Sequence, residues 1–265
     1  MQNCKGKLLD GKNALVTGGN RGIGASIVKA LAAQGANVIF NSSTPNPTAE
    51  LFAADIAREF GVQCVYVTCD VRVESEIDNM ITIAKERFKR IDILMNNAGK
   101  PCFNAIENLK LTDFVDSMKC NLTAPLLFCK KIVPMMKENK WGRIVNFSSA
   151  TTMKTEPNLG GYIIPKAGVN SLTKVLAKEV GTFGITVNAI VPGCTDTDML
   201  NKGVNEYAAN MGVSREVILG GVLGQHIIKE VINPDMVADF AIYLCTNSGR
   251  GLTGGLFPVD NGYTC

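Results

Sequence analysis

The chain has 265 residues, of which 46% are hydrophobic and 19% are charged, and Lys and Arg outnumber Asp and Glu by 27 to 24. This composition is typical of a globular α/β domain and unlike that of a disordered chain. The small positive excess is spread along the sequence, so it does not predict a nucleic-acid partner.

The first ten residues, the apolar runs and the cysteine content indicate the cellular compartment in which we expect the protein. The first ten residues are polar, and no apolar run approaches the ~18 residues of a membrane span. We therefore expect neither a signal peptide nor a membrane partner. The nine cysteines are odd in number and include no Cys-x-x-Cys pair, which favours free thiols over disulfides or zinc ligands. The expectation is a cytoplasmic protein without a metal site.

Seven short apolar runs alternate with helical patterns along the chain. The runs are 14–17, 37–40, 64–68, 91–95, 142–147, 186–191 and 256–259, and helical periodicity marks 27–33, 51–60, 77–88 and 169–180. Strands that are apolar on both sides are typical of a parallel sheet covered by helices on both faces. With right-handed crossovers, the pattern predicts an α/β fold. It would be a doubly wound parallel sheet of about seven strands in a single domain, residues 1–265.

Ligands of such sheets bind at the carboxyl ends of the strands, so the residues that follow each run are candidates for a site. Glycines, hydroxyls and amides dominate there, at 18–24, 41–44, 70–71, 96–99, 148–149 and 192–197. The first of these segments has the spacing Gly18-x3-Gly22-x-Gly24 directly before a helix. Glycines permit a tight turn and a close backbone approach, and the helix N-terminus offers free N–H groups. The segment predicts a phosphate cradle, with a simple tight connection as the alternative.

Tyr162 and Lys166 are four residues apart, so they share one face of a helix. A nearby ammonium group favours the phenolate, which would suit a tyrosine for general acid/base catalysis. Ser149 lies 13 residues earlier, just after the run 142–147, where its hydroxyl could hydrogen-bond a substrate oxygen. An isolated Tyr-x3-Lys pair is usually a coincidence, so this interpretation depends on the other motifs.

In combination, these motifs resemble the classical short-chain dehydrogenase/reductase family over about residues 11–262. The motifs are Thr-Gly-x3-Gly-Ile-Gly at 17–24, Asn-Asn-Ala-Gly at 96–99, Asn121, Ser149, Tyr162-x3-Lys166 and Pro192-Gly193. The resemblance implies a Rossmann fold and an NAD(P)-dependent oxidoreductase. Such an enzyme transfers a hydride between a nicotinamide cofactor and a carbonyl or secondary alcohol. Among its members, the chain is similar to 3-oxoacyl carrier-protein reductases.

The resemblance also implies a role for each candidate residue. Tyr162 would be the proton donor or acceptor, and Ser149 would orient the carbonyl oxygen. Lys166 would hold the nicotinamide ribose and lower the pKa of the tyrosine, while Asn121 would hold a water in a proton relay to Lys166. Asp70 and Val71 would contact adenine, and Thr195 and Thr197 the nicotinamide carboxamide. The full set of implied cofactor contacts is Gly18, Asn20, Arg21, Gly22, Ile23, Gly24, Asn41, Ser42, Ser43, Asp70, Val71, Asn97, Ala98, Gly99, Tyr162, Lys166, Pro192, Gly193, Thr195 and Thr197.

The end of the second run predicts which cofactor is used. Enzymes selective for NAD usually carry an acid there to bind the ribose 2′-OH, but the stretch 40–44 has none and the next acid is Glu50. Arg21 could pair with a 2′-phosphate, or it could be a solvated surface charge. We therefore expect NADP(H) to be favoured over NAD(H).

Pro165 departs from the family pattern, which more often has a small or polar residue directly before the lysine. Proline lacks an N–H and is tolerated in the first turn of a helix. Either the helix begins near Gly161, or the turn that carries Tyr162 and Lys166 is altered.

The substrate side of the sequence is less specific. A lid is expected at about 195–233, where Gly220, Gly221 and Gly224 would permit motion. Charged or reactive side chains after the strand ends either line the pocket or are solvated: Lys100, Cys102, Lys154 and Glu156. His226, the only histidine, is either a substrate contact or a residue on a loop or helix face.

Two rival functions stay open. One is an NAD-linked dehydrogenase of a polyol, sugar acid or hydroxysteroid, and the other is a non-catalytic cofactor-binding protein. The expected partner is a small-molecule carbonyl or alcohol substrate, with no nucleic acid. The resemblance further implies a homotetramer with contacts through helices near 122–136 and 161–180.

Overall fold

The computed structural model describes residues 6–265, built around one parallel sheet. Its strands are β1 Asn13–Val16, β2 Asn37–Ser42, β3 Cys64–Thr68, β4 Ile93–Asn96, β5 Gly142–Phe147, β6 Ile185–Pro192 and β7 Leu256–Val259. The strand order is β3-β2-β1-β4-β5-β6-β7, and every pairing is parallel. Each predicted run overlaps one strand, so the predicted seven-stranded, doubly wound sheet is confirmed. Cys4 and the first half of the polar segment 1–10 lie outside the described residues.

Nine α-helices connect and flank these strands within residues 6–265. They are α1 Gly22–Ala33, α2 Pro47–Phe60, α3 Glu74–Phe88, α4 Leu111–Met118, α5 Ala124–Glu138, α6 Gly160–Val180, α7 Asp198–Met211, α8 Arg215–Gly224 and α9 Pro234–Cys245. The four predicted helical patterns lie in α1, α2, α3 and α6, and each helix begins earlier than predicted. In α2 the reason is local, because Asn46 caps the backbone N–H of Ala49 and Pro47 occupies the first position. Such first turns carry no apolar periodicity.

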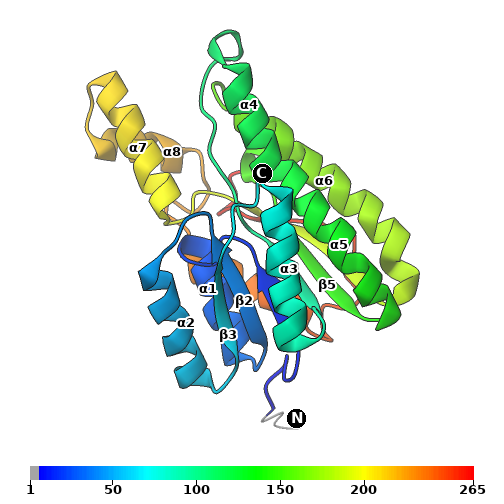
Figure 1. The fold of residues 1–265 in the computed structure, drawn as a ribbon. Helices are drawn as coiled ribbons and strands as arrows, with labels where there is room; N and C mark the ends of the chain where they lie inside the picture. Colours follow the sequence, from blue (N-terminus) through cyan, green and yellow to red (C-terminus); the bar gives the residue numbers. More distant parts are fainter. Residues whose placement is uncertain (1–5) are drawn as a thin grey trace.

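The core lies in two layers, one on each face of the sheet. Side chains alternate between the layers along a strand, so that Val16 packs on one side with α1, α2 and α9, and Leu15 on the other with α3, α5 and α6. Figure 1 shows α3, α5 and α6 together on one side of the strands. Because every strand runs in the same direction, all seven carboxyl ends meet at one edge.

That edge is covered by elements that leave the sheet. Helices α7 and α8 project beyond it, and so does α4 (Figure 1). A π-helical turn, Lys119–Thr123, joins α4 to α5. The predicted lid segment at 195–233 therefore contains two helices, and Gly220 and Gly221 lie inside α8, where a loop was expected.

Residues 6–265 contain neither a membrane-spanning helix nor a metal-binding cluster. No helix in this part of the chain is both long and apolar enough to cross a membrane, and no cluster of His, Cys, Asp and Glu side chains there is suited to a metal ion. The eight described cysteines are free thiols, and five of them are buried.

Candidate active site

The turn after β1 has the backbone of an anion cradle. Gly18 and Gly22 have φ angles of 65° and 52°, a region that favours glycine. A Cβ on Gly24 would fall almost on the carbonyl oxygen of Gly18. Helix α1 begins at Gly22 without an acidic residue in its first turn, and Arg21 makes no side-chain cap among the described residues. The first N–H groups of α1 thus face the turn, together with the positive end of the helix dipole.

Two amide side chains hydrogen-bond to the backbone of this cradle. Asn41 accepts a hydrogen bond from the Gly18 N–H (3.0 Å) and donates to the Cys69 carbonyl (2.7 Å). Asn97 donates to the carbonyls of Thr17 and Gly18 at 3.0 and 3.1 Å. Both predicted contact residues therefore lie at the cradle, but their side chains are used to hold its backbone. Thr17, the first residue of the glycine motif, had no role assigned from the sequence, and its hydroxyl accepts from the Ala98 N–H at 2.9 Å.

The end of β2 offers hydroxyls and no carboxylate. The Ser42 hydroxyl is already bonded to the Thr44 carbonyl and to the Tyr66 hydroxyl, each at 2.7 Å. Ser43 is exposed. Arg21 lies 3.6 Å from the carboxylate of Asp198, at the start of α7, with 71% of the Arg21 side chain exposed. An ion pair this exposed contributes little, so Arg21 is free to turn toward another anion.

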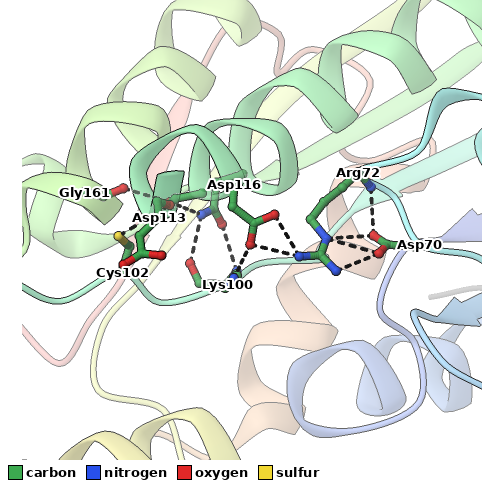
Figure 2. Close-up of polar contacts among 9 residues, drawn as sticks. Asp70, Arg72, Lys100, Cys102, Asp113, Asp116 and Gly161 are labelled. Carbon is green, nitrogen blue, oxygen red and sulfur yellow. Dashed lines mark hydrogen bonds and ion pairs between the residues drawn. The ribbon is translucent and has the colours of Figure 1, made fainter. Parts of the chain in front are cut away.

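Asp70 and Val71, the predicted adenine contacts, follow β3. Val71 is buried in the core. Arg72 hydrogen-bonds the Asp70 carboxylate and holds its pKa below the usual value. The same guanidinium bonds Asp116 of α4, and Lys100 pairs with Asp116 as well (Figure 2). Lys100, a candidate substrate contact, is thus part of an ion-pair chain that ties the loop after β3 to α4.

Two of the four predicted catalytic side chains, Asn121 and Lys166, meet at Gly99, and a third, Tyr162, lies beyond Lys166. A Cβ placed on Gly99 would lie 3.2 Å from Asn121 Oδ1 and 3.5 Å from Lys166 Nζ. Lys166 Nζ lies 5.9 Å from the ring centre of Tyr162 and donates to the Phe147 carbonyl at 2.6 Å.

The fourth side chain, Ser149, lies beside the tyrosine. Ser149 caps the short 3₁₀ turn Ala150–Thr152, and its hydroxyl is hydrogen-bonded to the Thr151 hydroxyl at 2.9 Å. The residues come from the loop after β5, the π-helical turn and the start of α6, so the fold brings together groups that are far apart in the sequence.

Burial controls the protonation of the Tyr162–Lys166 pair. It raises the pKa of Tyr162 to about 12, against a smaller lowering by the neighbouring Ser149 hydroxyl. It lowers the pKa of Lys166 from 10.5 to about 8. The resemblance implied that the lysine lowers the pKa of the tyrosine, and that role stays a prediction. Lys166 Nζ donates to the Phe147 carbonyl, and loss of hydration on burial is the largest influence on the pKa of both residues.

The segment after β6 lies opposite the glycine turn. A Cβ on Gly22 would be 3.0 Å from the methyl group of Thr197. Thr197 caps α7 by accepting from the Leu200 N–H at 3.3 Å, and the Thr195 hydroxyl donates to the Gly193 carbonyl at 3.1 Å. Pro192, Gly193, Thr195 and Thr197 therefore border the same space as the cradle, at the base of α7.

Comparison with known proteins decides the family. A family model described as short chain dehydrogenase matches residues 12–208, which include the cradle and all four catalytic candidates. The chain belongs to this family. It is accordingly an oxidoreductase that uses NAD(P) to interconvert CH–OH and C=O groups.

Relatives of this short-chain dehydrogenase align over nearly its whole length. A D-beta-hydroxybutyrate dehydrogenase of Cupriavidus necator is 33% identical over 261 residues, covering 97% of this chain and 99% of the relative. A 3-oxoacyl-(acyl-carrier-protein) reductase of Synechocystis is 34% identical over 250 residues, covering 94% and 95%. A crystal structure of actinorhodin polyketide ketoreductase with NADPH is 30% identical, with a TM-score of 0.90 and coverage of 96% and 97%.

The remaining candidates of this short-chain dehydrogenase contact the C-terminal segment. His226 is buried, stacks on Tyr263 with ring centres 5.0 Å apart, and shares a hydrogen bond with the Val222 carbonyl. The Tyr263 hydroxyl donates to Glu156 at 2.7 Å, and Lys154 Nζ lies 4.5 Å from the centre of the same ring. Tyr263 therefore links the loop after Ser149 to the end of α8, and the sequence analysis did not identify it.

Two buried polar groups of the site were also missed. Asn146 of β5 accepts from Asn96 and donates to the Thr173 hydroxyl, which fixes the strands below the site to α6. Ser117 of α4 contacts both Asn121 and Gly161. Its position four residues before Asn121 was the only available signal, because i and i+4 share a helix face.

Proposed function

We propose that this short-chain dehydrogenase is an NADPH-dependent ketoreductase in which Tyr162 donates the proton. The observation that carries the proposal is that Asn121 and Lys166 meet at Gly99, with the Tyr162 ring 5.9 Å from Lys166 Nζ, in the loop that also contributes Asn97 to the glycine cradle. A cofactor that lies along the carboxyl edge of the sheet would reach directly from the glycine cradle to these catalytic candidates.

The residues present fit a dinucleotide. Gly18, Gly22 and Gly24 leave a backbone cradle without Cβ atoms, and the free N–H groups of α1 suit a pyrophosphate. The segment with Thr195 and Thr197 would hold the nicotinamide end, and Lys166 the ribose beside it. NADPH supplies the hydride when bound. The protein supplies orientation, a proton and stabilisation of the developing oxyanion.

The protonation states favour reduction. With its pKa raised to about 12, Tyr162 keeps its proton at neutral pH and can release it to the more basic alkoxide that forms from the carbonyl. The Ser149 hydroxyl is placed to hydrogen-bond the same oxygen. Asn121 and Lys166 border Gly99 together, an arrangement that supports a proton path from Lys166 toward solvent.

Replacing the proton donor tests catalysis against mere binding. We expect Tyr162→Phe to lower kcat about 100-fold to 10,000-fold, the usual contribution of acid/base catalysis, while the Kd for NADPH stays within about threefold. The measurements are NADPH oxidation by absorbance and a fluorescence titration of NADPH. Unchanged turnover would exclude this role of Tyr162, and a wild type that binds NADPH but reduces no carbonyl would favour the non-catalytic alternative.

The choice of NADPH over NADH depends on the end of β2 and on Arg21. We expect a higher kcat/KM for NADPH than for NADH, because a 2′-phosphate would meet hydroxyls and Arg21 but no carboxylate. Arg21→Ala should reduce the NADPH preference about 10-fold and leave NADH kinetics unchanged. Asp198→Ala is the matched control, because it removes the present partner of Arg21 and should preserve or increase that preference. Equal or better kinetics with NADH would overturn the assignment.

A second candidate is the oxidation of a hydroxy acid by an NAD-linked dehydrogenase. It is supported by the D-beta-hydroxybutyrate dehydrogenases at 31% and 33% identity. A panel with acetoacetate, D-β-hydroxybutyrate, an acetoacetyl thioester, polyols and hydroxysteroids, each with both cofactors, separates the two. Faster reduction of the thioester with NADPH supports the ketoreductase, and faster oxidation of the hydroxy acid with NAD supports the alternative.

Three further expectations belong to this proposal. We propose that residues 195–233, with α7 and α8, form the substrate lid of a single catalytic domain. We propose that the chain assembles as a homotetramer through α5 and α6. The free thiols favour a reducing compartment, and we propose the cytoplasm.

A further inference from the structure

Pro165 removes one hydrogen bond from the helix that carries the catalytic tyrosine. It is the sixth residue of α6, beyond the first turn, where proline is tolerated. In an unbroken helix, the N–H of residue 165 would donate to the carbonyl of residue 161. Proline has no N–H, so the carbonyl of Gly161, which directly precedes Tyr162, has no donor from its own helix.

A hydroxyl from another helix takes that place. Ser117 Oγ donates to the Gly161 carbonyl at 2.7 Å, across 44 residues of sequence. Ser117 is 0% exposed, so water does not compete for the bond. Gly161 is also closely packed on Cys102, because a Cβ there would lie 2.5 Å from Cys102 Sγ. Figure 2 shows the polar contact that reaches Gly161 from the neighbouring α4 region.

The same hydroxyl orients Asn121. A serine has one hydrogen to donate, and Ser117 gives it to Gly161, so its lone pair accepts from Asn121 Nδ2 at 2.9 Å. The second Nδ2 hydrogen goes to the Lys100 carbonyl (2.8 Å), and Oδ1 accepts from the Lys100 N–H (3.1 Å). The amide is therefore held in one orientation, with its nitrogen toward Ser117.

We propose that Ser117 is a positioning residue that couples Asn121 to the turn of α6 carrying Tyr162, using the carbonyl that Pro165 leaves free. The inference rests on the proposed function of Asn121 and Tyr162. The buried Ser117 hydroxyl bonds both elements, so its oxygen sets the separation between the π-helical turn at 119–123 and the start of α6. Pro165, which disturbs the helix locally, creates the acceptor that makes this link possible.

A double-mutant cycle between Ser117 and Pro165 tests the link. Ser117→Ala leaves the Gly161 carbonyl and one Nδ2 hydrogen of Asn121 without a partner, so we expect Tm to fall by about 2–6 °C. In a Pro165→Ala background, the N–H of residue 165 can donate to Gly161. The fall in Tm caused by Ser117→Ala should then be clearly smaller.

We expect kcat and Tm to respond differently to the Ser117→Ala substitution in the two backgrounds. We expect Ser117→Ala to lower kcat about 10-fold to 100-fold through misplacement of catalytic groups, with the KM for NADPH within about twofold. In the double variant kcat should stay low, because Asn121 still lacks its acceptor although Gly161 has regained a donor. The assay uses the panel ketone that the wild type reduces fastest.

Thr173 provides a matched control. Its hydroxyl is also 0% exposed, donates to a helix carbonyl at 2.8 Å and accepts from an asparagine amide at 2.9 Å. That carbonyl, of Val169, lies where α6 supplies its own N–H donor. Thr173→Val should lower Tm by an amount that does not depend on Pro165.

Each outcome decides the proposal. It is overturned if Ser117→Ala keeps wild-type kcat, if its effect on Tm is the same with and without Pro165, or if kcat recovers together with Tm in the double variant. If Ser117→Ala alone is insoluble, the double variant carries the kcat test. The proposed function fails separately, through normal turnover by Tyr162→Phe, and the Tm cycle needs no activity.

Discussion

At the scale of single residues, the site combines a tyrosine that holds its proton and a lysine that releases it more easily than usual. Both effects come from burial, which penalises the charged form of either group. For Lys166, the folded protein binds the proton less tightly than the unfolded chain does. The free energy of unfolding therefore rises with pH between about 8 and 10.5 from this group alone. For Tyr162 the sign is opposite, and stability falls between about 10 and 12.

The lowered pKa of Lys166 gives an expected pH dependence of activity. In the proposed function the ammonium form of Lys166 holds the cofactor ribose, and kcat/KM for NADPH reports groups of the free enzyme. We expect this quantity to decrease as pH rises through about 8, with a limiting slope of one proton. Initial rates at limiting NADPH over a pH range that brackets this value provide the test. A constant kcat/KM well above that pH would show that Lys166 keeps its proton or has no role in binding.

At the scale of elements, the cradle between β1 and α1 forms because its glycines carry no side chains. Gly24→Ala would place a methyl group on the Gly18 carbonyl and beside the Asn97 amide, which must open the cradle. We expect the Kd for NADPH to rise at least about 100-fold, measured by fluorescence titration. Gly220→Ala in α8 is the control, because its Cβ meets nothing within 4 Å among the described residues. It should leave Kd unchanged and stabilise the helix by up to ~1 kcal/mol, and equal effects of the two would contradict the cradle.

At the scale of the whole molecule, α5 and α6 present apolar side chains outward. Leu126, Ile164 and Val175 are each about half exposed, which suits burial between subunits. We expect light scattering to give four times the chain mass of 28.4 kDa. Val175→Glu should shift the assembly to a smaller species because it places a carboxylate in that contact. A wild type that remains a monomer at micromolar concentration would contradict the proposed tetramer.

Strands, glycines and catalytic spacing were predictable from the sequence because each depends on neighbouring residues. The apolar runs specify buried parallel strands, and the spacing of Gly18, Gly22 and Gly24 marks a turn before a helix. Tyr162 and Lys166 share a face because of helical periodicity alone. Helix starts were less predictable, since their first turns, as at Pro47, carry polar or capping residues outside the apolar pattern.

Only the tertiary structure decided which groups meet and how strongly they are buried. Asn41 and Asn97 lie at the cradle as predicted, yet their amides are used by the backbone of remote segments. The raised pKa of Tyr162 follows from packing around α6, which no spacing reveals. The effect of Pro165 also depended on a distant partner, because Ser117 supplies the hydrogen bond that the helix lacks. Periodicity and turn preferences act within a few residues, whereas desolvation and buried hydrogen bonds depend on atoms that only the fold brings together.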